Sequence, residues 1–192
     1  MDAIDRHPWP HLLLDNFLPS RELQQSLAEI ASDSYEYGIE NRGTGRIEFS
    51  LLKSKTLWRA IYSPRTLFLL SAAFEVEVSL NKHNMLQLRR MNDQTPEFPR
   101  HNDSTSTGET IASFLYISRD WSSRCGGHLH LYATEEQETP SKSISPIQNR
   151  FVAFRTNAYH WHSVERVYGW ERLSVLAMWD IGDSDSLPVE AP

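Results

Sequence analysis

The first third of the chain carries apolar residues at helical spacing. Ser20 is expected to cap a helix over residues 21–32, and a shorter helix is expected over residues 55–62. Ser63 followed by Pro64 places a cap before a proline in the first helical turn, which predicts another helix. The apolar positions that carry this period are Leu23, Leu27, Ile30, Leu67, Leu70 and Phe74.

Two other stretches of this region differ from the helical pattern. The apolar run over residues 11–19 is short and predicts a strand, because it lacks the length of a stable helix. Residues 38–45 are bounded by glycines and rich in polar side chains, which predicts a mobile loop.

From about residue 77 the period changes to alternation. Leu86-Gln87-Leu88 alternates as a half-buried strand does. Polar loops are expected over residues 92–99 and 135–145, and the tail over residues 182–192 has too few apolar residues to pack. Further strands are expected over residues 110–118, 128–132, 150–154, 162–167 and 172–179.

Helices followed by a run of short strands predict a mainly β fold with N-terminal helices. We expect one domain over residues 1–192, with a helical support region over about residues 1–76. Residues 77–181 would form a double-stranded β-helix, the jelly-roll or cupin-like core, with the helices against one sheet.

Composition narrows the class of partner and the compartment. The formal net charge of −6 argues against a nucleic-acid backbone as the main partner. No apolar run has the length to span a bilayer, and the first ten residues lack a signal-peptide core, so we expect no membrane partner. The single cysteine, Cys125, fits a reducing cytoplasm and is interpreted as an ordinary loop thiol.

Three short pieces of sequence could carry chemistry together. His101 and Asp103 stand two positions apart, so an extended backbone would direct both to one side, where they could share a metal ion. His162 could complete a facial triad of two histidines and one carboxylate, which suits non-haem Fe(II) better than structural zinc. Arg172, with Ser174 on the same side of its strand, could clamp a carboxylate. Taken singly, each piece is also typical of an ordinary surface loop, strand or ion pair.

Other histidines compete for these roles. His160 would face the same side of an extended strand as His162, so periodicity alone does not choose between them. His128 and His130 follow the glycine pair at residues 126–127 but lack a third ligand at a natural spacing, so we interpret them as strand-face histidines.

The order of these pieces resembles the 2-oxoglutarate/Fe(II)-dependent oxygenases, in particular their prolyl-4-hydroxylase-like branch. The resemblance covers most of the chain and runs from His101-x-Asp103, through Gly-Gly-x-Leu-x-Leu-Tyr, to Arg172-x-Ser174. His162, Val164 and Val167 match the family's His-x-Val-x-x-Val pattern, which selects His162 over His160.

The resemblance implies a set of cofactors and roles. Fe(II) would be held by His101, Asp103 and His162, and 2-oxoglutarate by Arg172 with help from Ser174. Tyr116 would replace the aromatic contact that relatives have near Met91. O2 would be consumed with release of succinate and CO2, and ascorbate could serve as reductant. The carboxylate of Asp103 favours hydroxylation over halogenation, while desaturation and ring formation stay open.

Several alternatives stay open at the level of sequence. The substrate would be a small, amino-acid-like molecule or a peptidyl residue, bound by a monomer or homodimer. Arg89, Arg90 and Arg100 near the pocket mouth could bind a substrate carboxylate, and His128 could contribute to substrate recognition. A cupin-type metal enzyme without 2-oxoglutarate and a non-catalytic binding domain on the same fold are the other hypotheses.

Overall fold

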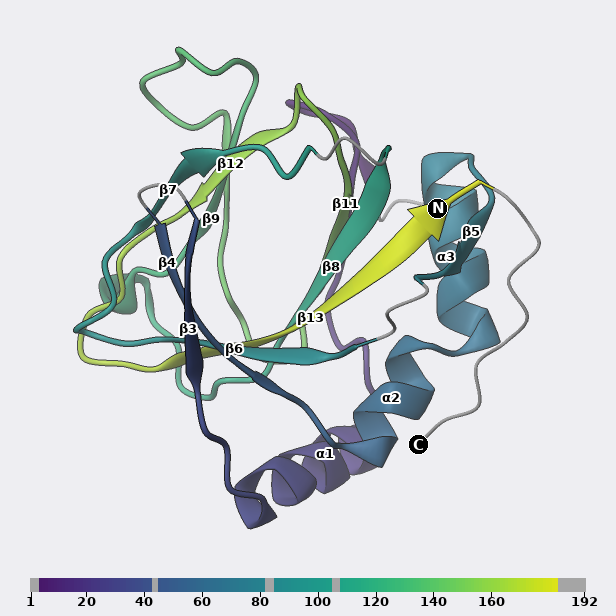
Figure 1. Ribbon diagram of the computed structural model, residues 1–192, viewed down its shortest axis with the longest axis vertical. Helices are drawn as coiled ribbons and strands as arrows, with labels where there is room; N and C mark the ends of the chain where they lie inside the picture. Colours follow the sequence, from purple (N-terminus) through teal and green to yellow (C-terminus); the bar gives the residue numbers. More distant parts are fainter. Residues whose placement is uncertain (1–3, 43–44, 82–84, 105–107, 183–192) are drawn as a thin grey trace.

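Two antiparallel sheets face each other, and three helices cover the outer face of the larger sheet (Figure 1). The computed structural model describes residues 4–42, 45–81, 85–104 and 108–182. Within these residues, no helix combines the length and the apolar character that crossing a bilayer requires.

The three helices confirm the predicted helical pattern. Ser54 and Ser63 cap the second and third helices, because each side-chain oxygen accepts the backbone N–H three residues later. The prediction that Ser20 caps the first helix is wrong: Pro19 is the cap residue, and Ser20 already lies in the first turn. The helices are α1 (Ser20–Ser32), α2 (Lys55–Ile61) and α3 (Pro64–Phe74).

The larger sheet has β13, the last described strand, near its centre. Its strands run in the order β1-β2-β11-β8-β13-β6-β4-β3, and β5 pairs with the far end of β13. The strands of this sheet are β1 (Ile4–Asp5), β2 (His11–Leu14), β3 (Gly38–Arg42), β4 (Gly45–Leu51), β5 (Val78–Leu80), β6 (Gln87–Met91), β8 (Thr110–Tyr116), β11 (Phe151–Thr156) and β13 (Arg172–Ile181).

The smaller sheet lies across from the middle of the larger one and completes the predicted jelly-roll core (Figure 1). Its order is β10-β9-β12-β7, and a short 3₁₀ turn, η1 (Ser123–Cys125), precedes β9. The strands are β7 (Phe98–His101), β9 (Leu129–Tyr132), β10 (Lys142–Ile144) and β12 (Trp161–Val164).

Three predicted loops contain strands. The loop predicted over residues 38–45 is wrong, because β3 and β4 pair from Gly38 opposite Phe49 onward and form a hairpin at the edge of the larger sheet. The loop over residues 135–145 ends in β10, which pairs with β9, and the loop over residues 92–99 ends in β7. The N-terminal region, predicted as a helical support, therefore contains strands as well as helices. The tail prediction falls almost wholly on residues 183–192, which lie outside the described residues.

Two hydrophobic clusters lie on the two faces of the larger sheet. One fills the space between the helices and the larger sheet and includes Leu57, Leu70 and Trp179. The other fills the space between the two sheets and includes Phe154, Leu131 and Leu176. The second cluster fixes the spacing of the sheets, because close-packed side chains resist a change in separation.

Helix α3 offers a matched pair of substitutions that tests this packing. Leu70→Ala should lower the free energy of unfolding by about 2–5 kcal/mol, because the buried side chain leaves a cavity. Phe68→Ala, on the exposed side of the same helix, should change it by less than about 0.5 kcal/mol. Urea denaturation measures both, and equal effects would contradict the packing of α3 described above.

Candidate active site

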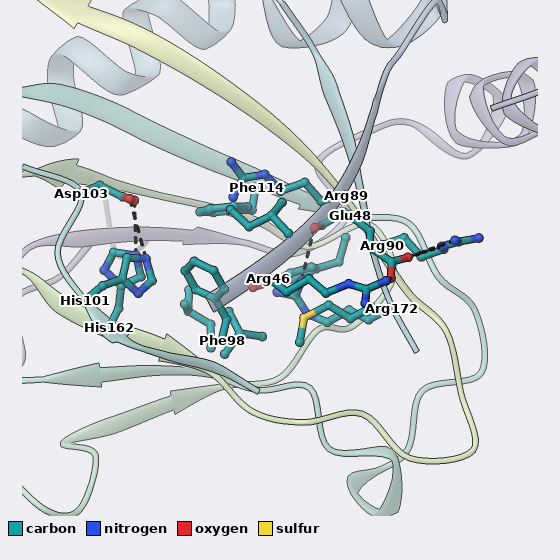
Figure 2. Close-up of a pocket in the computed structure, with 16 residues that line it drawn as sticks. Arg46, Glu48, Arg89, Arg90, Phe98, His101, Asp103, Phe114, His162 and Arg172 are labelled. Atoms are coloured by element: carbon teal, nitrogen blue, oxygen red, sulfur yellow. Dashed lines mark hydrogen bonds and ion pairs between the residues drawn. The ribbon is translucent and has the colours of Figure 1, made fainter. Parts of the chain in front are cut away.

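His101, Asp103 and His162 converge at one end of the space between the sheets (Figure 2). Strands β7 and β12 pair with His101 directly opposite His162, so both rings project from the same face. The Nε2 atoms of His101 and His162 lie 3.7 Å and 3.4 Å from the carboxylate oxygens of Asp103. One ligand atom from each residue lies within 4.8 Å of the other two, a separation that a single metal ion can bridge.

The hydrogen bonds of the two imidazoles direct the same nitrogen toward this point. His101 Nδ1 lies 2.8 Å from the carbonyl oxygen of Pro99, and His162 Nδ1 lies 3.0 Å from that of His160. A carbonyl only accepts, so Nδ1 carries the proton in each ring. In a neutral ring Nε2 is then unprotonated and has the lone pair that a metal needs.

Burial and neighbouring charges keep His101 and Asp103 in the protonation states that bind a metal. Burial, and next the charge of His162, lower the pKa of His101 to about 4, so its ring is neutral near pH 7. Burial acts to raise the pKa of Asp103, but contact with His162 and the charges of His162, His101 and Arg89 hold that pKa below its ordinary range. Asp103 is therefore a carboxylate at neutral pH.

Arg172 is a buried cation in the same pocket. Its Nε donates to the Gly127 carbonyl oxygen at 3.0 Å, and its Nη1 donates to Ser174 Oγ at 3.3 Å. It is 5% exposed, and it forms no ion pair with a carboxylate in the part of the chain that the structure describes. A buried charge that lacks a counter-ion is unfavourable, so this guanidinium is suited to receive an anion.

Tyr116 lies beside Arg172. The guanidinium carbon sits 4.8 Å from the centre of the Tyr116 ring, and Ser174 pairs with Tyr116 across β13 and β8. The Tyr116 hydroxyl is buried and has no hydrogen-bond partner of good geometry among the described residues. Burial raises the pKa of this phenol, although the nearby Arg172 charge opposes the shift, so the hydroxyl stays protonated and can donate.

The triad and Arg172 share one pocket with about 570 Å³ of empty space, its open mouth included (Figure 2). Candidate metal ligands therefore lie at one part of the pocket, and a guanidinium suited to a carboxylate lies at another. This combination can hold a metal ion together with an acid that reaches both.

Comparison with known proteins agrees with this geometry. Residues 88–179 match the family model described as the 2OG-Fe(II) oxygenase superfamily, and the match includes the triad, Tyr116, Arg172 and Ser174. Residues 88–179 are therefore similar to members of that superfamily. A comparison of the sequence with curated proteins finds no match.

Solved oxygenase structures share the fold. A prolyl-4-hydroxylase from Pseudomonas putida superposes with a TM-score of 0.68 at 16% identity, covering 91% of this chain and 93% of the other. A prolyl hydroxylase from Trichoplax adhaerens, solved with a hypoxia inducible factor peptide fragment, gives 0.64 at 18% identity over 88% and 82%. The α-ketoglutarate-dependent epimerase SnoN of nogalamycin biosynthesis gives 0.65 at 14% identity over 94% and 88%.

The other histidines that the sequence offered as ligands lie outside the triad. His160 precedes β12, stacks on Trp9 at 4.5 Å between ring centres, and its Nδ1 donates to the Arg155 carbonyl oxygen. His128 and His130 alternate with Leu129, which lines the pocket, so their rings face away from it. Glu165 holds His128 at 2.6 Å, and Ser143 holds His130 at 2.8 Å.

Sequence reasoning missed the part of the pocket that β4 contributes. Arg46, Ile47 and Glu48 line it, and all three directly follow the segment predicted as a loop over residues 38–45. The alternation of Ile47 and Phe49 with polar neighbours was the available signal for a strand. Apolar lining residues that were also not assigned to the site are Met91, Phe98, Phe114, Leu129 and Val164.

Two glycines with positive φ give a test of how Arg172 is positioned. Gly127 has φ +77°, and a Cβ at this position would lie 3.3 Å from Arg172 Cδ, so Gly127→Ala should displace the guanidinium. Gly169 has φ +58° with nothing within 4 Å, so Gly169→Ala adds only backbone strain of about 1–2 kcal/mol.

Both variants should lose stability in urea denaturation, but only Gly127→Ala should weaken 2-oxoglutarate binding, measured by calorimetry. Equal weakening in the two variants would contradict the role of Gly127 in seating Arg172.

Proposed function

We propose that this protein is an Fe(II)- and 2-oxoglutarate-dependent dioxygenase that hydroxylates an unactivated carbon of a small, amino-acid-like molecule. One observation carries the proposal: three candidate metal ligands converge in the same pocket as a buried arginine without a carboxylate partner among the described residues. An arrangement with only the triad, or only the arginine, would fit many other functions.

His101, Asp103 and His162 would hold Fe(II) through two imidazole nitrogens and one carboxylate oxygen. Three protein ligands on one face leave coordination positions for other molecules, as non-haem Fe(II) oxygenases require. Fe(II) bound there would supply the oxidising chemistry, in which O2 and 2-oxoglutarate are converted with release of succinate and CO2. The carboxylate of Asp103 would occupy a ligand position, which favours hydroxylation over halogen transfer.

Arg172 would bind the distal carboxylate of 2-oxoglutarate, because a guanidinium presents paired donors that match a carboxylate. Ser174 and Tyr116 offer hydroxyls next to it, and the buried Tyr116 hydroxyl makes no hydrogen bond of good geometry with the described residues. Together they would fix the length and direction of an acid that reaches from Arg172 to the metal.

The pocket walls would exclude water from the reacting carbon. Between the charged groups the lining is apolar and partly aromatic, which lowers the local dielectric and protects a reactive oxidant. The side chains of this lining are Met91, Phe98, Phe114, Leu129 and Val164.

A small substrate is favoured over a peptidyl residue by the hairpin of β3 and β4. A Cβ placed on Gly45 would lie 2.3 Å from the ring of Phe98, so β4 of the larger sheet packs directly against β7 of the smaller sheet. The hairpin therefore covers one side of the pocket and leaves less room for an extended peptide. The alternative is a peptidyl substrate, in line with the peptide complex of the Trichoplax enzyme.

The first expected result concerns the metal ligands. Purified protein with Fe(II) should convert 2-oxoglutarate to succinate, slowly without substrate and faster with it. His162→Ala should lower this rate at least on the order of 100-fold, since loss of a ligand's supporting partner alone costs about 10–100-fold.

His130→Ala is the matched control, because His130 lies on the outer face of the smaller sheet and should leave the rate unchanged. Succinate formation that survives in the His162→Ala variant would rule out the assigned triad.

The second expected result separates the oxygenase from a cupin-type enzyme that does not use 2-oxoglutarate. Arg172→Leu should raise the dissociation constant for 2-oxoglutarate on the order of 100-fold, because a buried charge pair is lost. Its affinity for Mn(II), a redox-inert stand-in for Fe(II), should be unchanged. Calorimetry measures both constants, and an unaltered 2-oxoglutarate affinity would favour the cupin-type alternative.

A further inference from the structure

The pocket is electropositive although the chain is acidic. Four arginines line it, namely Arg46, Arg89, Arg90 and Arg172, against the two carboxylates of Glu48 and Asp103. The formal net charge of the whole chain is −6. Fe(II) and the dianion of 2-oxoglutarate would add opposite charges, so the excess of positive charge would remain when both are bound.

Two of these arginines already have a carboxylate partner. Arg90 donates to Glu48 from Nε at 3.1 Å and from Nη2 at 3.0 Å, and its guanidinium stacks 4.0 Å from the centre of the Tyr37 ring. Arg46 donates to the other oxygen of Glu48 at 2.7 Å. Glu48 is 6% exposed, so this group is a fixed part of the wall between β4 and β6.

Arg100, which the sequence also suggested as a substrate contact, points elsewhere. Its guanidinium lies 4.0 Å from the centre of the Tyr132 ring, and it bonds to the Glu135 carbonyl oxygen. Tyr132 alternates with Leu131, a residue of the cluster between the sheets, so Arg100 lies on the outer face of the smaller sheet.

Arg89 is the arginine that faces the metal end of the pocket. In the pairing of β6 with β13 it lies opposite Ser174, so it projects from the same face as the residues proposed to bind 2-oxoglutarate. Its Nε and Nη2 both donate to Gln87 Oε1 at 3.3 Å, which holds the side chain along its own strand. Figure 2 shows its side chain in the pocket together with Phe114 and the triad.

Arg89 lines the same pocket as His101, Asp103 and His162, so its side chain and the candidate metal ligands border one space.

We propose that Arg89 is a specificity-determining residue that binds a carboxylate of the substrate beside the metal. The proposal deepens the proposed function and rests on it: Arg172 would take the carboxylate of 2-oxoglutarate, and Arg89 that of the molecule to be oxidised. A planar guanidinium presents paired donors whose geometry matches a carboxylate. The substrate class is a small organic acid, such as a free amino acid, whose oxidised carbon lies near its carboxylate.

The test uses full-length protein with Fe(II), 2-oxoglutarate and O2, and measures succinate release above the rate without substrate. The probes are the free L-amino acids, each compared with its own carboxamide. At least one acid should raise succinate release and gain one oxygen by mass spectrometry, while its amide should do neither. Arg89→Leu should raise the KM for that acid on the order of 100-fold, and Arg89→Lys should recover part of the loss.

Arg100→Gln is the control, since it removes the same charge from the neighbouring outer face and should leave that KM unchanged. The rate without substrate and the affinity for 2-oxoglutarate, both measured in the wild-type protein, report the proposed function separately. If the wild-type protein lacked both, the dioxygenase assignment itself would be wrong, whatever the effect of Arg89.

Three outcomes would overturn the role of Arg89. Amides could serve as well as acids, or an end-blocked peptide could be the only effective probe, or no acid could stimulate a protein that turns over 2-oxoglutarate. A fourth contrary result is a loss of Mn(II) affinity in the Arg89→Leu variant with an unchanged KM for the acid. That result would make Arg89 a positioning residue for Asp103.

Discussion

The site depends on the antiparallel pairing of β7 with β12. Because the pairing sets His101 directly opposite His162, two imidazoles from distant parts of the chain share one face of the smaller sheet. The backbone carbonyl groups of Pro99 and His160 then orient both rings, so the sheet fixes where the histidines lie as well as which nitrogen faces the pocket. A shift of one residue in this register would turn one of the rings to the outer face.

The larger sheet supplies the buried positive charge of the pocket, whereas the smaller sheet supplies the two histidines. Arg172 lies in the larger sheet, and its burial is possible because Gly127, Tyr116 and Ser174 surround it with a carbonyl group, a ring face and a hydroxyl. None of these neighbours is negative, so the guanidinium is hydrogen bonded but not neutralised. Such a site is less stable when empty than an ion pair would be, and an incoming carboxylate removes that penalty.

Much of this arrangement could be predicted from residue spacing, and the reasons for the exceptions are physical. The helices of residues 20–74 follow from hydrophobic period, because each buries one face. The strand bearing Arg172 follows from a nearly continuous apolar run, because it is buried on both faces of the larger sheet. The hairpin of β3 and β4 could not be recognised as easily, since its glycines and charged residues are typical of loops. Glu48 is buried there only because Arg46 and Arg90 lie on either side of it, and this contact depends on strand pairing across the sheet.

The choice between His160 and His162 shows the same limit. Both have the same parity on an extended strand, so alternation gives no preference, and only the family pattern selected His162. In the folded chain β12 begins at Trp161, and His160 turns aside to stack on Trp9. Phe154 contacts both Trp9 and the ring of His162, so the packing between the sheets that excludes His160 also supports the candidate ligand. The separation of the two sheets, and with it the distance from the triad to Arg172, is thus set by the same aromatic core that decides which histidine faces the pocket.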